Sequence, residues 1–184
     1  MISKEKIDFI INWIKNYTNT IKTQPVTLVI GVSGGVDSAL TSTLCAHTGL
    51  NTIAISMPIK QNSSQHELSL RHLEFLKKNF DNVDTRVIKL DEIFKTFEST
   101  MKDYDSELAF ANSRSRLRMV TLYQVAQSNN GIVVGTGNKV EDFGVGFYTK
   151  YGDGGVDISP IADCNKTEVW ELARELGIIE DIID

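Results

Sequence analysis

The stretch that decides the fold reads Val26-Thr27-Leu28-Val29-Ile30-Gly31-Val32-Ser33-Gly34-Gly35-Val36-Asp37-Ser38. Its largely apolar first part, residues 26–30, is typical of a strand that is buried on both faces. Two adjacent glycines between serines follow, and then residues 38–47 have the pattern of a helix. A strand, a glycine-rich turn and a helix form an arrangement that binds phosphate. Glycines let backbone N–H groups face an anion, and the helix N-terminus adds positive potential.

The residues at the end of this turn limit the kind of phosphate-binding loop that it can be. No Gly-Lys-Ser/Thr sequence closes it, so it is not the P-loop that holds phosphates for γ-transfer. Two hydroxyls, from Ser33 and Ser38, and the carboxylate of Asp37 suit a pyrophosphate group with its magnesium ion. Ser-Gly-Gly-Val-Asp-Ser resembles the pyrophosphatase loop of the N-type ATP pyrophosphatases. The alternative is a flexible turn without a ligand.

The composition of the chain is that of a globular protein. Its 184 residues suit one domain, 1–184, and are 41% hydrophobic and 23% charged. A net charge of −5 disfavours a nucleic-acid partner. No apolar run suits a signal peptide or a membrane span, so we expect a cytoplasmic protein without a membrane partner.

Cysteines and histidines give no sign of a metal site. Cys45 and Cys164 are isolated, and we expect both to be buried as small apolar residues in a reducing compartment. The three histidines have no metal-ligand spacing, and we expect them at the surface: His47, His66 and His72.

Strand and helix patterns alternate along the chain. Helical spacing of Ile7, Ile10, Ile11, Ile14 and Tyr17 predicts one buried stripe on a first helix. The predicted strands are 26–30, 51–57, 83–90 and 131–135, and the predicted helices are 3–19, 38–47, 64–79, one from 91, and 107–128. This alternation indicates an α/β fold in three layers, a parallel sheet flanked by helices. Ligands of such sheets bind beyond the carboxyl ends of the strands.

A second glycine cluster follows the last predicted strand. Eight of the 13 glycines lie between residues 131 and 155. A strand, a loop and a hairpin turning at 152–154 would account for the glycines. It would not account for the polar residues interleaved with them, Thr136, Glu141, Lys150 and Asp157.

At this point the sequence closely resembles the ammonia-dependent NAD synthetases, over roughly residues 5–180. The first loop is shared widely among ATP pyrophosphatases, whereas Phe147-Tyr148-Thr149-Lys150-Tyr151-Gly152-Asp153-Gly154-Gly155 is highly specific. Four further features match, namely Arg114-Ser115-Arg116-Leu117-Arg118-Met119, Gly135-Thr136-Gly137-Asn138 followed by Glu141, Pro160-Ile161, and Lys166-Thr167-Glu168-Val169.

The resemblance implies a Rossmann-like fold of the adenine nucleotide alpha hydrolase type and a set of residue roles. Asp37 and Glu141 would bind Mg²⁺ and, with Lys166, form the catalytic group. Arg116, Lys150 and Asp157 would bind deamido-NAD. A homodimer is also implied. The helical stripe 7–17 and the long helix 107–128 are candidate interface surfaces, and the alternative for each is packing on its own sheet. ATP, as co-substrate, would contact Lys166, Thr136 and the first loop, that is Gly31, Val32, Ser33, Gly34, Gly35, Val36, Asp37 and Ser38.

Helix geometry divides the three arginines. Residues four apart share a helix face, so Arg114 and Arg118 belong together and Arg116 projects elsewhere.

The chain departs from the family in two places. Against the family pattern we expect one additional residue between Glu141 and Phe147, near Gly144, and a chain without the usual C-terminal segment.

The implied reaction is an amidation. Deamido-NAD would be adenylated by ATP and then attacked by ammonia, giving NAD, AMP and pyrophosphate. Neither cysteine has the setting of a nucleophile, so free ammonia rather than glutamine is the expected donor. Two alternatives remain open: a truncated nucleotide-binding form without turnover, and another ligase or tRNA-modifying enzyme that uses the same loop.

Overall fold

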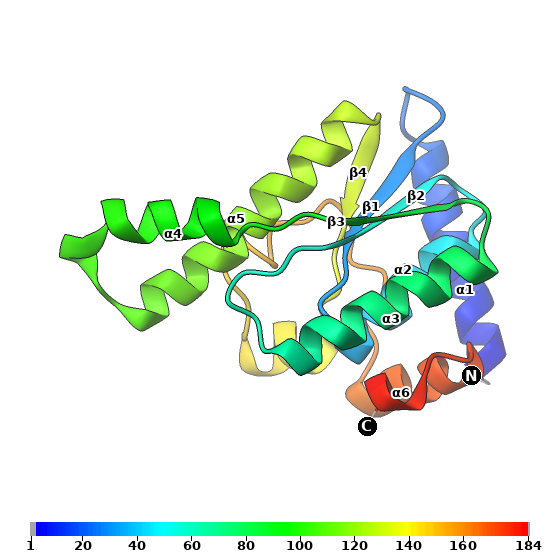
Figure 1. The fold of residues 1–184 in the computed structure, drawn as a ribbon. Coiled ribbons are helices and arrows are strands. Elements are labelled where there is room, and N and C mark those ends of the chain that lie inside the picture. Colours follow the sequence, from blue (N-terminus) through cyan, green and yellow to red (C-terminus); the bar gives the residue numbers. More distant parts are fainter. Residues whose placement is uncertain (1–2, 184) are drawn as a thin grey trace.

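The computed structural model describes residues 3–183, an α/β fold built on a four-stranded parallel sheet (Figure 1). The strands are β1 (Thr27–Gly31), β2 (Thr52–Ser56), β3 (Val83–Val87) and β4 (Gly131–Val134). The helices are α1 (Ser3–Asn19), α2 (Val36–His47), α3 (Ser63–Asn79), α4 (Asp91–Thr100), α5 (Glu107–Ser128), α6 (Lys166–Glu175) and α7 (Glu180–Ile183), with a short 3-10 turn (Lys102–Tyr104) and a π-helical turn (Val140–Val145). None of the helices within 3–183 is long and apolar enough to cross a membrane.

The strand order is β3-β2-β1-β4, and every pairing is parallel. The chain therefore moves outward from β1 through β2 to β3 and then returns to the opposite side of β1. This reversal places the topological switch point between β1 and β4. At that point Ile30 pairs with Val134, so the segments that leave β1 and β4 emerge side by side.

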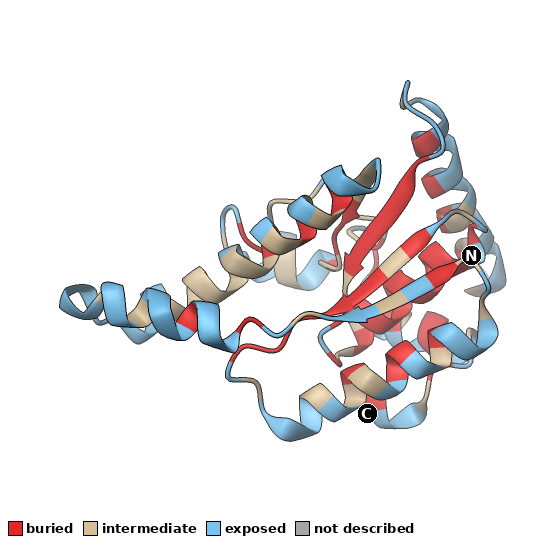
Figure 2. Ribbon diagram, turned by 45° about the horizontal axis from the view of Figure 1, so that its top comes forward, coloured by how far each residue is buried: buried red, intermediate tan, exposed pale blue. Residues whose placement is uncertain are grey.

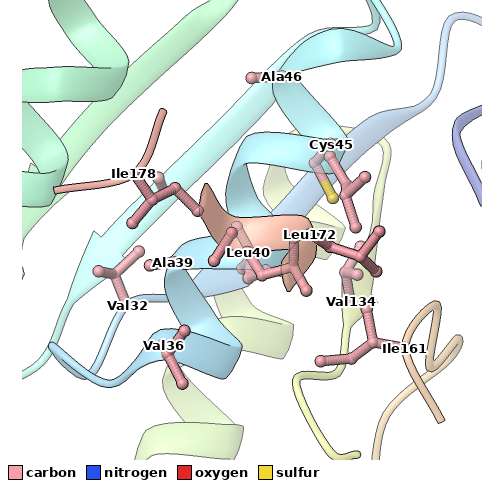
Figure 3. Packing of buried hydrophobic residues seen from close by; sticks show 14 of the residues in the cluster. Val32, Val36, Ala39, Leu40, Cys45, Ala46, Val134, Ile161, Leu172 and Ile178 are labelled. Atoms are coloured by element: carbon pink, nitrogen blue, oxygen red, sulfur yellow. The ribbon is translucent and has the colours of Figure 1, made fainter. Parts of the chain in front are cut away.

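Helices cover both faces of the sheet, which explains why β1 is apolar throughout. Leu28 and Ile30 belong to a core shared with α1, α2, α3 and α6, whereas Val29 belongs to a core shared with α5. All three side chains are fully buried. Figure 3 shows the first core, in which apolar residues of α2 meet Leu172 of α6 and Val134 at the end of β4.

The predicted elements are confirmed, with short differences at their ends. The third strand ends at Val87 rather than at residue 90, because its partner β2 ends at Ser56 and Pro58 follows. The last strand ends at Val134, where Gly135 N donates instead to Ile158 O (2.8 Å). Helix α2 begins two residues earlier than predicted, at Val36.

The buried stripe of α1 differs from the prediction at its last position. Ile7, Ile10 and Ile14 are buried against the first core, and Thr18 rather than Tyr17 continues the stripe. Tyr17 is 37% exposed and stacks on Trp13, with 5.9 Å between the ring centroids. Residue 18 lies four positions after residue 14, so it shares that helix face more closely than residue 17 does.

Helix α4 and the first half of α5 extend away from the sheet (Figure 1), and most of α4 is exposed (Figure 2). Phe94 is the one buried residue of α4. Its ring packs edge-on against Phe110 of α5, at 6.2 Å between centroids, and Phe97 contacts both rings. This aromatic cluster joins the two helices where no strand lies beneath them.

The turn between β1 and α2 depends on one glycine. Gly34 has a φ of +93°, and a Cβ there would lie 2.2 Å from the backbone oxygen of Gln65. Left-handed backbone is costly for residues with a Cβ, and a backbone oxygen cannot move aside as a flexible side chain can. Gly34 therefore allows the first loop to pack directly on the beginning of α3.

We predict that Gly34→Ala destabilises the protein more than Gly49→Ala does. Gly49 also has a positive φ, +76°, but nothing lies within 4 Å of its Cβ position. Backbone strain alone costs about 1–2 kcal/mol, and overlap with a rigid neighbour adds about 1–3 kcal/mol. The free energy of unfolding in urea measures both variants. An equal decrease in the free energy of unfolding for both variants would show that the contact with Gln65 is unimportant.

One of the three histidines is not at the surface. His72 is fully buried, its Nε2 lies 2.8 Å from Ser42 Oγ, and its ring stacks on Phe75. The prediction of a surface position was wrong because the partner, Ser42, is thirty residues away on α2. Burial lowers the pKa of His72 to about 4. Both cysteines are free and buried, as predicted.

We predict that His72 makes the protein less stable in mild acid. Its pKa is lower in the folded state than the unfolded value of about 6.5. The unfolded chain therefore binds the proton more readily between these values, and stability falls as the pH falls through that range. From pH 7 to pH 5 the titration of His72 lowers the free energy of unfolding by about 2 kcal/mol.

Urea unfolding at pH 7 and pH 5 measures this loss. His72→Gln should remove most of the difference between the two pH values, whereas His47→Gln, a change at an exposed histidine, should remove much less. If His72→Gln retains the full pH dependence, other groups cause it.

Candidate functional site

The first loop presents hydroxyls and an open helix end at the edge of the sheet. Ser38 Oγ accepts a hydrogen bond from Ser33 N (3.1 Å) and donates one to Gly35 O (2.9 Å), which fixes the turn. Gly35 occupies the N-cap position of α2, and no side chain forms a capping hydrogen bond there. The N-terminus of α2 is therefore free of a side-chain cap, as suits an anion.

Three of the residues that the sequence marks as catalytic meet at this helix end. Lys166 is the first residue of α6, and its Nζ lies 2.5 Å from Asp37 Oδ2 and 3.2 Å from Glu141 Oε1. Asp37 is in the first turn of α2, and Glu141 is in the π-helical turn that follows β4. Two carboxylates from separate crossovers thus face one positively charged nitrogen.

The charges at this site favour a cation. Partial burial lowers the pKa of Lys166, but its hydrogen bond to Asp37 and its attraction to both carboxylates outweigh burial and leave the pKa raised. The pKa of Asp142, which follows Glu141, is raised by burial and by the negative charges of Asp153, Glu141 and Asp37. Lys166 is accordingly held in its charged form, among acidic groups that outnumber it.

The donor set fits a magnesium ion that also binds substrate oxygens. No group of three or more His, Cys, Asp or Glu side chains with the spacing of a metal site occurs within residues 3–183. Mg²⁺ commonly takes only one or two protein carboxylates and completes its shell with phosphate oxygens and water. Asp37 and Glu141 supply that number, and Lys166 Nζ shows that a cation can be held between them.

A cavity of about 700 Å³ opens beside the first loop. Gly31, Val32 and Ser33 form one wall, and Thr136 lies on the wall that follows β4. The remaining walls come from α5, from Met57 after β2, and from the loop 146–149. Both its volume and its largely apolar lining with a few polar groups are typical of a small-molecule site.

The second glycine cluster forms a loop that is docked on α5 and not a hairpin. Ser115 Oγ donates to Asp153 Oδ1 (2.7 Å) and accepts from Asp153 N (2.9 Å). Thr149 Oγ1 donates to Asn112 Oδ1 (2.8 Å). A Cβ on Gly152 would lie 2.3 Å from Ser115 Oγ, so the loop reaches α5 this closely only with glycine there.

The three arginines of α5 divide as helix geometry predicts. Arg118 Nε donates to Met57 O (3.0 Å), and Arg114 lies over the Phe94 ring (5.6 Å). The charge of Arg114 adds to burial in lowering the pKa of Arg118, which confirms that these two lie near each other. Arg116 points elsewhere, is exposed, and donates from Nε to Lys150 O (3.0 Å).

Asp157 lies apart from the Asp37 group. Its Oδ2 accepts from Val133 N (2.7 Å), and its Oδ1 accepts from the hydroxyl of Tyr123 (3.0 Å). Burial and this carboxylate raise the pKa of Tyr123 to about 12. Of the three residues assigned to deamido-NAD, Arg116 and Lys150 contact each other, and none of the three lines the cavity.

Sequence reasoning gave no role to Asn138, which is fully buried in the site and donates from Nδ2 to Asp37 Oδ1 (2.9 Å). It also missed Gln61, whose Nε2 donates to Ser33 O (2.8 Å). A signal for Asn138 was present in Gly135-Thr136-Gly137-Asn138, at the carboxyl end of a strand. Gln61 lies in the segment between β2 and α3, where no pattern distinguishes it.

Comparison with known proteins agrees with this geometry. A family model described as NAD synthase matches residues 6–184. The NH(3)-dependent NAD(+) synthetase of Carboxydothermus hydrogenoformans is 39% identical over 188 residues, which cover 98% of this chain and 73% of the relative.

Two solved structures are similar over the whole chain. The NMN synthetase from Francisella tularensis has a TM-score of 0.91 and 32% identity, and the match covers 74% of that protein. The NH3-dependent NAD synthetase from Campylobacter jejuni, in complex with the nitrate ion, has a TM-score of 0.88 and 30% identity, with 77% covered. The fold, the glycine-rich turn after β1 and the sequence similarity lead to one conclusion: this chain belongs to the NAD synthase family.

Proposed function

We propose that the protein catalyses the ATP-dependent amidation of deamido-NAD by ammonia, giving NAD, AMP and pyrophosphate. The observation that carries this proposal is the convergence of Asp37 and Glu141 on Lys166, at the uncapped end of α2 and near the cavity. Two of the three proteins named above, from Carboxydothermus hydrogenoformans and Campylobacter jejuni, are NH3-dependent NAD synthetases, and neither buried cysteine of this chain lies in a nucleophile setting.

The reaction has two steps. The nicotinate carboxylate attacks the α-phosphorus of ATP, a carboxylate–phosphorus bond forms, the α–β anhydride bond breaks, and pyrophosphate leaves. Ammonia then attacks the acyl carbon, AMP leaves with its bond electrons, and the nitrogen loses a proton. In this proposal the first loop and the N-terminus of α2 bind the departing phosphates, and Lys166 supplies a fixed positive charge there.

Asp37 and Glu141 would hold Mg²⁺, and their donor set fits such an ion as described above. When bound, the ion supplies positive charge that neutralises the polyphosphate. Thr136 would contact ATP from the wall of the cavity, and Arg116, Lys150 and Asp157 would bind the dinucleotide acceptor outside it. The cavity walls would limit the access of water to the acyl adenylate.

Two further properties belong to the proposal. A homodimer is expected by resemblance. Ile7, Ile10 and Ile14 of α1 are buried in the protein's own core, whereas Phe9, Trp13 and Tyr17 of the same helix are exposed. Helix α5 has exposed apolar residues, Leu108 and Val120, that suit a contact between copies. A cytoplasmic location agrees with two free cysteines. Sedimentation tests the first property.

One assay separates the candidate activities. AMP formation is measured with ATP, Mg²⁺ and ammonia, and the acceptor is deamido-NAD, nicotinic acid mononucleotide, xanthosine monophosphate or tRNA. The mononucleotide is included because of the similarity to the Francisella tularensis NMN synthetase. We expect deamido-NAD to support turnover. ATP binding without AMP formation from any acceptor would instead indicate a nucleotide-binding form without turnover.

We predict that Asp37→Asn removes turnover and preserves the fold. Loss of a carboxylate on the cation lowers kcat by about 100-fold or more, while an amide of the same shape can still accept from Asn138. Asp84→Asn, which changes an exposed carboxylate on β3, is the matched control and should be fully active. A near-normal rate for Asp37→Asn, with melting temperatures unchanged, would remove Asp37 from the cation site.

We predict that Arg116→Ala weakens binding of the dinucleotide and not of ATP. Loss of one charge-assisted hydrogen bond raises the KM for deamido-NAD about 10- to 100-fold. The KM for ATP should change less than about twofold, because Arg116 lies outside the cavity. Arg71→Ala, at an exposed arginine paired with Asp181, serves as the control. Equal increases in both KM values would place Arg116 elsewhere.

A further inference from the structure

Asn138 is a fully buried side chain whose polar atoms are all used within the site. Its Oδ1 accepts hydrogen bonds from Val140 N (3.0 Å) and Glu141 N (3.1 Å). Its Nδ2 donates to Asp37 Oδ1 (2.9 Å). One amide therefore contacts the segment that carries Glu141 and, at the same time, the carboxylate of Asp37.

The orientation of this amide follows from its partners. Backbone N–H groups can only donate, so the atom that faces Val140 and Glu141 must be the oxygen. The nitrogen then faces Asp37, where it meets an acceptor. Because each partner accepts only one orientation, the amide cannot turn over without losing all three hydrogen bonds.

We propose that Asn138 is a positioning residue that sets the geometry of the two cation-binding carboxylates, Asp37 and Glu141. The inference rests on the proposed function, which assigns a divalent cation to this pair. Asn138 donates a hydrogen bond to Asp37 Oδ1, and Asp37 Oδ2 is directed at Lys166 Nζ. It also fixes the beginning of the turn on which Glu141 is carried.

Few other side chains can do both tasks. The site needs one acceptor for two N–H groups and one donor for a carboxylate, at zero exposure. Serine and threonine accept well from backbone N–H groups at helix starts, but their hydroxyl is too short to reach Asp37 as well. Aspartate would accept from the backbone but would place a second negative charge against Asp37.

This difference provides the test. Asn138→Ser retains the contacts to the backbone N–H groups and removes the contact to Asp37, whereas Asn138→Ala removes both. Mn²⁺ is titrated into each protein in the presence of ATP and followed by electron paramagnetic resonance. We expect half-saturation of Asn138→Ser to need about 10- to 100-fold more Mn²⁺ than the wild type, as for other residues that orient metal ligands.

Kinetics separate positioning from a general loss of structure. For Asn138→Ser the Mg²⁺ concentration at half-maximal pyrophosphate release should rise by a similar factor of about 10–100, and saturating Mg²⁺ should restore most of kcat. The KM for deamido-NAD should change less than about twofold. If Asn138→Ser does not fold, Asn138→Thr gives the same comparison.

The matched control is Asn82→Ala. The Asn82 amide makes two hydrogen bonds to backbone oxygens, to Ala46 O (2.9 Å) and Leu50 O (2.8 Å), next to the amino end of β3. It should lower the melting temperature and leave the Mn²⁺ titration unchanged. Wild-type Mn²⁺ binding by Asn138→Ser would overturn the proposal. Wild-type protein that binds Mn²⁺ with ATP but makes no AMP from deamido-NAD would overturn the proposed function alone.

Discussion

The candidate site depends on the parallel pairing of β1 with β4. Pairing of Ile30 with Val134 makes the two strands end together, so the first loop and the segment 135–141 leave the sheet at the same edge. A third segment is brought to that edge by the bond from Gly135 N to Ile158 O, which precedes α6 and Lys166. Asn138 and Lys166, which are 101 and 129 positions from Asp37 in sequence, thereby contact it.

The charges at this edge explain why the three segments are held there by polar contacts. Two carboxylates close together repel each other unless a cation lies between them. Lys166 provides one positive charge, and a phosphate-bound divalent ion would provide more. The side chain of Asp37 is only 16% exposed, so water screens it little, and the Asn138 amide offsets part of the cost of its burial. Glu141, at 42%, is more open to solvent and to a substrate.

The sequence predicts those parts of the molecule that local pattern determines. β1 follows from an apolar run, α1 follows from helical spacing, and the division of the α5 arginines follows from helix geometry. The pattern of the first loop points to Asp37 and the family resemblance points to Glu141, and the structure brings both carboxylates to Lys166. The same kind of signal marks Asn138, but an asparagine after Gly135-Thr136-Gly137 is equally typical of a turn, so its role was not predicted. The burial of His72 was not predicted either, since it depends on a distant serine.

Each glycine cluster contains residues that allow the close approach of two chain segments. Gly34 brings the first loop onto Gln65, and Gly152 brings the second loop onto Ser115. Gly137 similarly leaves room for Asp142, whose carboxylate would overlap a Cβ at that position. The glycines of the second cluster therefore shape a compact wall beside the cavity and need not contact phosphate themselves. In the proposed function the two loops differ in chemistry: the first would offer hydroxyls, a helix end and the Asp37 carboxylate to magnesium-bound phosphates, whereas the segment that follows β4 would add the carboxylate of Glu141.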